Sequence, residues 1–385
     1  MSEQSKRIYL SVPHMSGRER IYVDRAFDEN WVSTVGPNLD EFEDQLQGRM
    51  GQPCVALSSG TAAIHLGLMA LGVSDGDEVV CPTLTFGASC FPIVYLGARP
   101  VFLDSERESW NLDPSALDDF LRLRARQGKL PRAVIVVHLF GQSAKIGVIL
   151  DICQRHGVRV LEDAAEALGS VFESKQPGCF GDVGVFSLNG NKMITSSGGG
   201  FVTSKDPKLV NTIRHWSTQA RDADPDQIGN SYHSSLGFNY RMSNVLAGIA
   251  LGQLEVLDER VSQRRRVFEQ YKLAFRGYPG LEPQPELKGS LHSRWLSCFL
   301  VNESSFGSTR DNIIRNLASR NIESRPVWRP MHFQKVFHGY HYFGGTVSED
   351  LHLRGICLPS SSSLVPEQQA QVIDGVVETA HDISS

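Results

Sequence analysis

The sequence lacks the cysteine pattern of a disulfide-bonded or zinc-binding protein. Its seven cysteines are odd in number and scattered, and no two of them are arranged as C-x-x-C. Such a set predicts neither a framework of disulfide bonds nor a zinc site. We therefore expect the chain to work in a reducing compartment, the cytoplasm, without a bound metal.

Two further absences exclude classes of partner. The formal net charge is -5, so the chain has no basic excess with which to attract a nucleic acid. No stretch approaches the roughly 18 consecutive apolar residues of a membrane span. The polar start, from Met1 to Arg7, is not followed by the apolar segment of a secretion signal. The sequence predicts a cytosolic protein that binds neither nucleic acid nor membrane, and whose phosphate ligands are small molecules.

The chain does contain many short apolar runs rich in β-branched residues, several of them separated by segments with helical spacing. This alternation predicts an α/β fold with a mostly parallel sheet covered by helices on both faces. A length of 385 residues, 41% of them hydrophobic, favours two domains. The expected strands are residues 54–57, 78–81, 99–104, 133–138, 158–163, 182–187 and 200–203.

The second half of the chain has a different pattern. Apolar spacing from Ser243 to about Phe275 predicts one long helix, and we interpret its triplet Arg264 to Arg266 as a solvent-exposed face. A stretch rich in proline and glycine, residues 278–290, then leads into a smaller α+β region. We predict a large domain with an N-terminal arm, residues 1–255, and a smaller C-terminal α+β domain, residues 256–385.

The most informative stretch runs from Phe186 to Gly200, FSLNGNKMITSSGGG. It places a single lysine, Lys192, among polar and glycine-rich residues directly after an apolar strand. A lysine that forms a Schiff base needs a backbone that can approach a planar cofactor closely, and glycine permits this because it has no Cβ. The pattern predicts that Lys192 carries a cofactor on its amine.

A carboxylate stands at the end of another expected strand. Asp163 would lie at the carboxyl edge where open α/β sheets bind ligands, and it could pair with a pyridine nitrogen and keep that nitrogen protonated. The alternative is that Asp163 caps a helix beginning at Ala164. Glu166, one helical turn further, would either face the ring hydroxyl or line that helix. Together, Lys192 and Asp163 point to pyridoxal 5'-phosphate.

Other positions are suited to bind a phosphate group or to stack on a cofactor ring. Residues 58–65 follow a strand and open a helix, so the amides of Gly60 and Thr61 could hold a phosphate, although the same residues also match a simple N-cap. Phe86, in a loop after a strand, could stack on a cofactor ring or pack in the core. Ser187, at the end of a strand, could offer its hydroxyl to the phosphate or only pack there.

Two polar clusters lie further along the chain. Gly237 to Ser243 contains Asn239 and Arg241, whose side chains suit phosphate or carboxylate groups, although periodicity alone matches a helix cap. Arg325 to His332 combines tryptophan with arginines, which could bind a nucleotide or brace a turn.

These motifs together resemble the DegT/DnrJ/EryC1/StrS family of nucleotide-sugar aminotransferases, and the resemblance runs over nearly the whole chain. The motifs that carry it are Ser59-Gly-Thr-Ala-Ala, Glu162-Asp-Ala-Ala-Glu-Ala-Leu-Gly, Phe186-Ser-Leu-Asn-Gly-Asn-Lys, Gly237-Phe-Asn-Tyr-Arg-Met-Ser and Leu358-Pro-Ser. Within the family, the chain is most similar to the 4-aminotransferases of N-acetylbacillosamine-type pathways in the segments Asn189–Gly200, Ser217–Arg221, Arg294–Ser297 and Arg325–Trp328.

The resemblance implies a fold type I aminotransferase that uses pyridoxal 5'-phosphate and works as a homodimer with shared active sites. It would move an amino group from L-glutamate to the C4 ketone of a nucleotide-linked 4-keto-6-deoxy sugar, here a UDP-2-acetamido-2,6-dideoxy-4-keto-hexose. Lys192 would be the Schiff-base lysine and would also move the proton.

The family motifs also imply roles for individual residues. Gly60, Thr61 and Ser187 would hold the phosphate, Asp163 the pyridine nitrogen and Phe86 the ring face. Glu166 would be a further cofactor contact, and Asn239 would reach the partner's phosphate. The expected contacts of the sugar nucleotide are Asn30, Trp31, Ser33, Arg241, Arg325, Trp328 and His332.

Some alternatives remain after the resemblance. Certain members carry histidine in place of Lys192 and remove a hydroxyl from the sugar. Because this chain has the lysine, we do not expect it to catalyse that dehydration. Gly198 stands where many relatives carry glutamate, a departure shared by the bacillosamine-type subgroup. Amination at C3 and a cofactor-holding regulatory protein without turnover stay open, as does the choice among UDP, dTDP and GDP.

Overall fold

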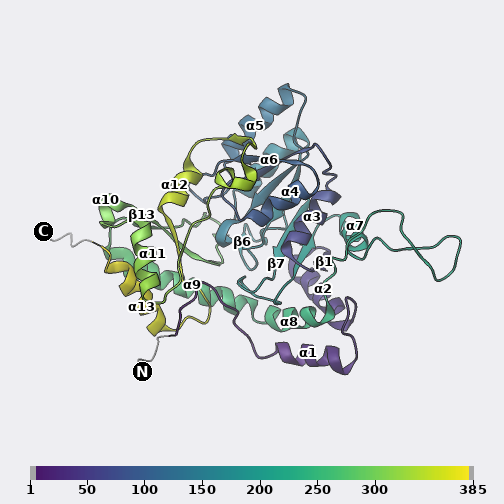
Figure 1. Cartoon of the computed structure of the whole chain (residues 1–385), viewed down its shortest axis with the longest axis horizontal. Helices are drawn as coiled ribbons and strands as arrows, with labels where there is room; N and C mark the ends of the chain where they lie inside the picture. Colours follow the sequence, from purple (N-terminus) through teal and green to yellow (C-terminus); the bar gives the residue numbers. More distant parts are fainter. Residues whose placement is uncertain (1–5, 381–385) are drawn as a thin grey trace.

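The computed structural model describes residues 6–380, and its centre is an eight-stranded sheet with the order β1-β8-β7-β5-β4-β2-β3-β15 (Figure 1). β8 runs antiparallel to both of its neighbours, and the other pairs are parallel. The predicted α/β fold with a mostly parallel sheet is therefore confirmed. The strands are β1 (Cys54–Leu57), β2 (Glu78–Pro82), β3 (Arg99–Leu103), β4 (Ala133–Val137), β5 (Arg159–Asp163), β7 (Val183–Ser187), β8 (Gly200–Thr203) and β15 (Tyr342–Phe343).

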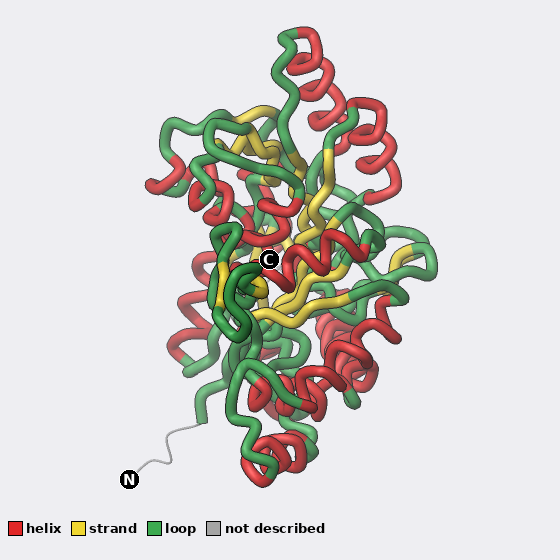
Figure 2. The backbone as a smooth tube through the Cα atoms, turned by 90° about the vertical axis from the view of Figure 1, so that its right-hand side faces the viewer, coloured by secondary structure: helices red, strands yellow, loops and turns green. Residues whose placement is uncertain are grey.

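Helices cover both faces of the sheet because its strands are apolar on both sides. All five residues of β4 are buried, and they alternate between two cores. Ile135 and Val137 share a core with α3 (Gly60–Ala70), while Val134 and Val136 share another with α5 (Pro114–Arg126) and α6 (Ile146–His156). Figure 2 shows the strands passing between these layers of helices.

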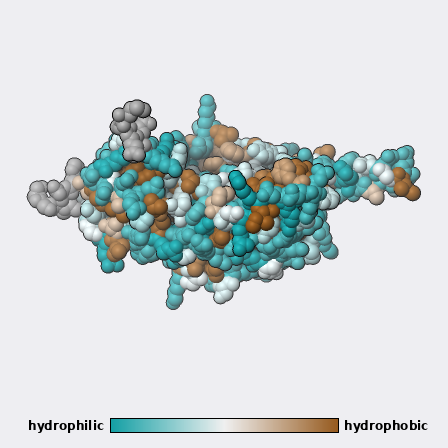
Figure 3. Space-filling view, turned by 90° about the horizontal axis from the view of Figure 1, so that it is seen from below, coloured by the Kyte–Doolittle hydropathy of each residue, from teal (hydrophilic) through white to brown (hydrophobic). Residues whose placement is uncertain are grey.

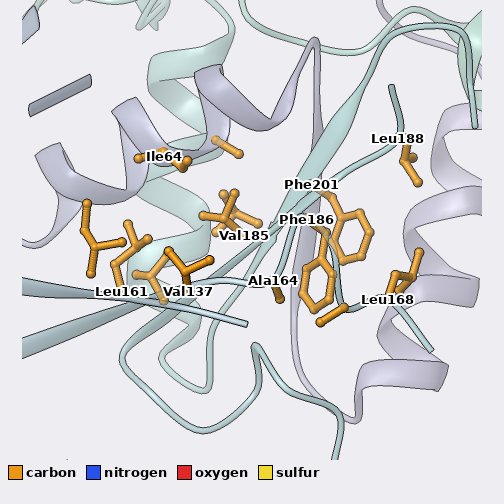
Figure 4. Packing of buried hydrophobic residues seen from close by; sticks show 14 of the residues in the cluster. Ile64, Val137, Leu161, Ala164, Leu168, Val185, Phe186, Leu188 and Phe201 are labelled. Atoms are coloured by element: carbon orange, nitrogen blue, oxygen red, sulfur yellow. The ribbon is translucent and has the colours of Figure 1, made fainter. Parts of the chain in front are cut away.

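The core on the α3 side holds the start of that helix against the sheet. Ile64 of α3 points toward Val137 and Val185 (Figure 4). Beside them, Phe186 of β7 stacks on Phe201 of β8 with the ring centroids 4.4 Å apart. This packing sets the first turn of α3 beside the end of β7 and the start of β8.

The single helix predicted from Ser243 to Phe275 is wrong, because the chain forms α8 (Asn244–Leu254) and α9 (Leu257–Ala274) with Glu255 and Val256 between them. α8 is largely buried and packs against α1 (Glu19–Asp28) and α2 (Pro37–Met50). α9 is highly charged and has one buried side. The two residues at the break are neither proline nor glycine, so packing rather than local sequence ends the first helix.

The chain after α9 forms an antiparallel sheet with the order β11-β13-β16-β14. It shares a core with α11 (Arg310–Ser319) and α13 (Pro366–Val377), on the left of Figure 1. From the same half of the chain, β15 instead joins the edge of the large sheet beside β3. The strands are β11 (Leu281–Pro283), β13 (Ser297–Val301), β14 (Arg325–Pro326) and β16 (Gly355–Leu358).

A hairpin of β9 (Asp222–Ala223) and β10 (Ser231–Tyr232) follows α7 (Pro207–Ser217) and projects from the body of the molecule (Figure 1, Figure 3). The apolar side chains of Ile228 and Leu236 are exposed there. The other elements are α4 (Phe91–Tyr95), α10 (Glu303–Phe306), α12 (Val347–Arg354), β6 (Val171–Phe172), β12 (Ser290–Leu291) and the 3-10 turns Gly87–Ser89, Leu139–Gly141, Phe275–Gly277, Met331–Phe333 and Lys335–Phe337.

Within residues 6–380, no helix combines the length and the apolarity needed to cross a membrane. Residues 1–5, which make up most of the polar start, lie outside the described residues.

Candidate active site

A pocket of about 310 Å³ lies where β5 and β7 end and α3 begins. A wider groove of about 720 Å³ beside α9 has no lysine in its lining, so the predicted chemistry belongs to the smaller pocket. This is the carboxyl edge of the parallel strands, where α/β sheets bind their ligands. The predicted site residues that line it are Gly60, Thr61, Phe86, Asp163, Glu166, Ser187, Lys192 and Trp328.

Asp163 is buried at the end of β5 and held by hydroxyl and amide donors. Ser89 donates its hydroxyl to Oδ2 at 2.7 Å, and Thr85 Oγ1 lies 2.7 Å from Ser89 Oγ. The amide of Ala165 donates to Oδ1 at 3.1 Å. The alternative of a helix cap is wrong, because residues 164–169 form turns and no helix follows. The carboxylate is thus oriented by fixed donors at the pocket wall.

Lys192 and Glu166 meet inside the pocket. The Nζ of Lys192 lies 3.7 Å from Oε1 of Glu166, whose Oε2 accepts the amide of Phe140 at 2.8 Å. Burial raises the pKa of the Glu166 carboxyl, although the charge of Lys192 opposes this. Because Glu166 lies in a turn, it does not line a helix as the alternative required. The pair places an amine and a buried carboxyl on the same side of the pocket.

The start of α3 forms a narrow polar corner. The hydroxyl of Ser59 accepts the amide of Ala62 at 3.0 Å, so Ser59 is an N-cap. This is compatible with phosphate binding, since the first amides of a helix have no acceptor within it. A Cβ at Gly60 would lie 3.0 Å from the Cβ of Ser187, and one at Gly200 would lie 2.7 Å from the backbone nitrogen of Gly60. The corner therefore offers amides and a hydroxyl without bulky side chains.

Aromatic rings form another wall of the pocket. Phe86 is 53% exposed, so it is not a core residue, and its ring centroid lies 5.5 Å from that of Trp328. Trp328 also lies 5.8 Å from Phe140. The indole nitrogen of Trp328 is buried and makes no hydrogen bond within the described residues. This wall thus presents flat aromatic rings and one hydrogen-bond donor, the indole N–H of Trp328, that has no acceptor among the described residues.

Other predicted substrate contacts are engaged elsewhere in this chain. The guanidinium of Arg241 is buried, where it pairs with Glu43 and donates to the backbone oxygen of Ala56 at 2.8 Å. Arg325 is exposed and pairs with Glu323 at 2.8 Å.

His332 is also held outside the pocket lining. Its Nδ1 lies 2.6 Å from the hydroxyl of Thr83, and its Nε2 lies 3.4 Å from a carboxylate oxygen of Glu349.

The remaining predicted contacts lie on the surface. Asn30, Trp31 and Ser33 are exposed in the loop between α1 and α2. Asn239 is exposed and accepts a hydrogen bond from Gln219 at 3.1 Å. None of these four lines the pocket of its own chain, and the role of Asn239 at a neighbouring subunit stays a prediction.

Sequence reasoning missed three groups at the pocket. Thr85 and Ser89 stand in the same loop as Phe86, and that run of hydroxyls after a strand was the available signal. Trp295 lies within a segment of the family motif but was given no role.

The interpretation of the basic triplet on α9 is wrong for Arg264, which is 1% exposed. Burial lowers the pKa of its guanidinium to about 9. Arg265 is half-buried and pairs with Glu286 at 2.8 Å, and Arg266 alone of the three is exposed.

Known proteins resemble this chain along almost its entire length. A model of the DegT/DnrJ/EryC1/StrS aminotransferase family matches residues 13–377. EpsN of Bacillus subtilis (strain 168), named as a pyridoxal phosphate-dependent aminotransferase, is 45% identical over 383 residues, which cover 98% of this chain and 97% of EpsN. The GDP-perosamine synthase of Escherichia coli O157:H7 is 34% identical over 98% of this chain and 100% of that protein.

Among solved structures, a DegT DnrJ EryC1 StrS aminotransferase from Brucella abortus superposes with a TM-score of 0.86. It is 26% identical, and the match covers 94% of this chain and 95% of that one.

The groups in the pocket fit the cofactor of such enzymes. Lys192 offers an amine, Asp163 a carboxylate, Phe86 a ring face and the start of α3 a set of amides, and pyridoxal 5'-phosphate needs a partner of each kind. The chain belongs to the DegT/DnrJ/EryC1/StrS aminotransferase family, and its cofactor is pyridoxal 5'-phosphate.

Proposed function

We propose that the protein moves an amino group from L-glutamate to the C4 ketone of a nucleotide-linked 4-keto-6-deoxy sugar, UDP-2-acetamido-2,6-dideoxy-4-keto-hexose. The observation that carries the proposal is the amine of Lys192 in one pocket with the oriented carboxylate of Asp163. The similarity to a protein named as a GDP-perosamine synthase supports a nucleotide-linked sugar as the class of acceptor.

The residues around the cofactor would orient it. When bound, pyridoxal 5'-phosphate supplies a sink for the electrons released at the substrate carbon. Asp163 would face the ring nitrogen, and Ser89 would prevent that carboxylate from turning away. Gly60 and Thr61 would bind the phosphate through the helix start, together with the hydroxyl of Ser187.

Lys192 would move the proton. Once free, its amine would accept a proton from the substrate carbon and return it on the cofactor side of the pocket. Glu166 would hold the released amine on its own side of the pocket, since its carboxyl lies 3.7 Å from Nζ.

The sugar nucleotide would be bound at the rim of this pocket and by a second copy of the chain. Trp328 lines the pocket, whereas Trp31 and Asn239 are exposed and free to approach another subunit. We therefore propose a homodimer in which Asn239 of one copy reaches the phosphate site of the other.

A spectrum of the purified protein tests both halves of this reaction. L-glutamate should bleach the visible band of the bound cofactor, and UDP-2-acetamido-2,6-dideoxy-4-keto-glucose should then restore it. NMR of the product should show the new amine at C4, and an amine at C3 would refute the position proposed. If only a GDP-linked or dTDP-linked sugar restored the band, the proposed choice of UDP as the nucleotide would be refuted. A band that glutamate does not bleach would favour a regulatory protein without turnover.

A further inference from the structure

Arg264 of α9 is a buried cation whose acceptors are all uncharged oxygens. It donates to the backbone oxygens of Trp295 at 2.6 Å, Ser360 at 3.1 Å and Lys192 at 3.4 Å, and to the hydroxyl of Ser11 at 3.0 Å. Burying a charge without a countercharge is unfavourable unless hydrogen bonds compensate it. Arg264 thereby joins α9, the N-terminal segment, the residues before β13 and the loop of the catalytic lysine.

Trp295 is fixed at both its backbone and its ring. Its indole nitrogen donates to the backbone oxygen of Asn191 at 2.6 Å, and the hydroxyl of Ser11 donates to the same oxygen at 2.8 Å. The ring is 2% exposed and stacks near Phe140 with the centroids 6.3 Å apart. Because Asn191 precedes Lys192, the indole is tied directly to the lysine's loop.

The amine of Lys192 lies over one face of this indole. The Nζ of Lys192 lies 4.3 Å from the centre of the Trp295 ring, and the side chain of Lys192 is only 13% exposed. A cation within about 6 Å of a tryptophan face is attracted by the electrons of the ring, most strongly where water is excluded. The carboxyl of Glu166 lies 3.7 Å from the same nitrogen. The amine therefore rests between an aromatic face and a carboxyl group.

We propose that the indole face of Trp295 is the resting place of the Lys192 amine whenever that amine is not joined to the cofactor, with Arg264 holding the indole and the lysine loop together. Trp295 is then a positioning residue that keeps the released amine beside the substrate carbon. The proposal rests on the aminotransferase function above, in which the amine is released and recaptured in every turnover.

NMR of the protein loaded with pyridoxamine 5'-phosphate tests the resting place directly, because Lys192 has no covalent link in that form. With ¹³C at the ε-carbons of the lysines, the ring current of the indole should shift the ε-protons of Lys192 upfield. The signal is assigned by its loss in K192A. It should move to an ordinary position in W295L, keep part of its shift in W295F, and stay in place in W216F, which changes a tryptophan of α7 outside the pocket.

Rapid mixing with L-glutamate tests the consequence. At saturating glutamate, W295L should lose its visible band about tenfold more slowly than the unchanged protein, because the amine is no longer held in place. The half-saturating glutamate concentration should stay within about twofold, and W295F should recover most of the rate. An equal change in both quantities would indicate a general disturbance of the pocket and would overturn the proposal.

A second measurement keeps the test decisive where W295L does not fold. Fluorinated tryptophan keeps the shape of the ring and weakens the attraction of its face for a cation. Replacing all five tryptophans in this way should slow the glutamate reaction of the unchanged protein but not that of W295F. An unshifted lysine signal, or equal rates with and without fluorine, would overturn the proposal. A shifted signal without any response to glutamate would uphold it and refute the proposed function.

Discussion

The cofactor end and the sugar end of the site are built differently. At the cofactor end, Asp163, Ser187 and Lys192 line one pocket because the sheet brings the ends of β5 and β7 together. At the sugar end, the predicted contacts Asn30 and Trp31 lie exposed outside that pocket. The difference teaches that the folding of one chain gathers the predicted cofactor groups Asp163, Ser187 and Lys192, whereas the predicted sugar contacts Asn30 and Trp31 do not join them in that chain.

The largest expected effect comes from removing the centre of the cofactor end. K192A should lower the rate of the glutamate half-reaction by at least about 1,000-fold, because it removes both the attachment point and the proton carrier. Stopped-flow absorbance checks this, with the exposed K205A as the control. An undiminished rate in K192A would show that another group carries the chemistry.

A second test measures how much the buried residue next to Asp163 contributes to the free energy of unfolding. Glu162, next to Asp163, pairs with His138 at 2.9 Å and accepts the amides of Gly178, Phe180 and Gly181. E162Q replaces a buried carboxylate that accepts several hydrogen bonds and should reduce the free energy of unfolding by about 3 kcal/mol at neutral pH. Urea titration measures this, and the exposed E173Q should change little.

The pH dependence of that loss has a definite sign. Burial raises the pKa of Glu162, but the hydrogen bonds from His138 and from the amides of Gly181 and Gly178 outweigh it, so the net pKa is lowered. The ionised form is favoured in the folded state, and its stabilisation is present above the unfolded pKa of about 4.3. The difference in the free energy of unfolding between the unchanged protein and E162Q should therefore become smaller as the pH falls below that value. A gap that widens in acid would contradict the assignment.

A smaller effect is expected from the hydroxyl that orients Asp163. S89A removes a donor at 2.7 Å but leaves the carboxylate in place. The glutamate half-reaction should slow by about tenfold, in line with the loss of one hydrogen bond to a charged group. S74A changes an exposed serine on another loop and should leave the rate unaltered. Equal rates in S89A and the unchanged protein would show that Asp163 needs no such support.

The smallest expected effect is a partial recovery of activity, which tests whether a second copy of the chain contributes Asn239 to the site. If Asn239 serves a neighbouring copy, mixing K192A with N239A should restore a fraction of the activity, at most about a quarter, because about half of the dimers are mixed and each mixed dimer contains one intact site of two. Activity is measured after subunit exchange has been confirmed by mass spectrometry. No recovery after exchange would show that Asn239 does not serve the phosphate site of a neighbouring copy.

Some of the fold and the site could be predicted because the evidence is local. The strands follow from short β-branched runs, and Lys192 and Asp163 follow from polar residues placed directly after such runs. The break between α8 and α9 could not be predicted, since Glu255 and Val256 are compatible with a helix and the contacts of α8 with α1 and α2 are not visible in the sequence.

Burial was the harder property to predict. Arg264 and Arg266 stand two positions apart in one basic triplet, yet one is buried and the other exposed. A run of arginines on a helix is the same in sequence whichever of its sides is later covered. The covering segments, around Ser11 and Ser360, come from opposite ends of the chain.

The sequence by itself determined the chemical groups of this protein and the family to which it belongs, because an amine, a carboxylate and a glycine-rich helix start keep their character wherever they lie. Tertiary structure alone decided their environments. Glu162 and Glu166 belong to one short motif, but the pKa of Glu162 is lowered and that of Glu166 is raised. The reason is that a pKa depends on burial and on the distance to other charges, and both are set by segments far away in the sequence.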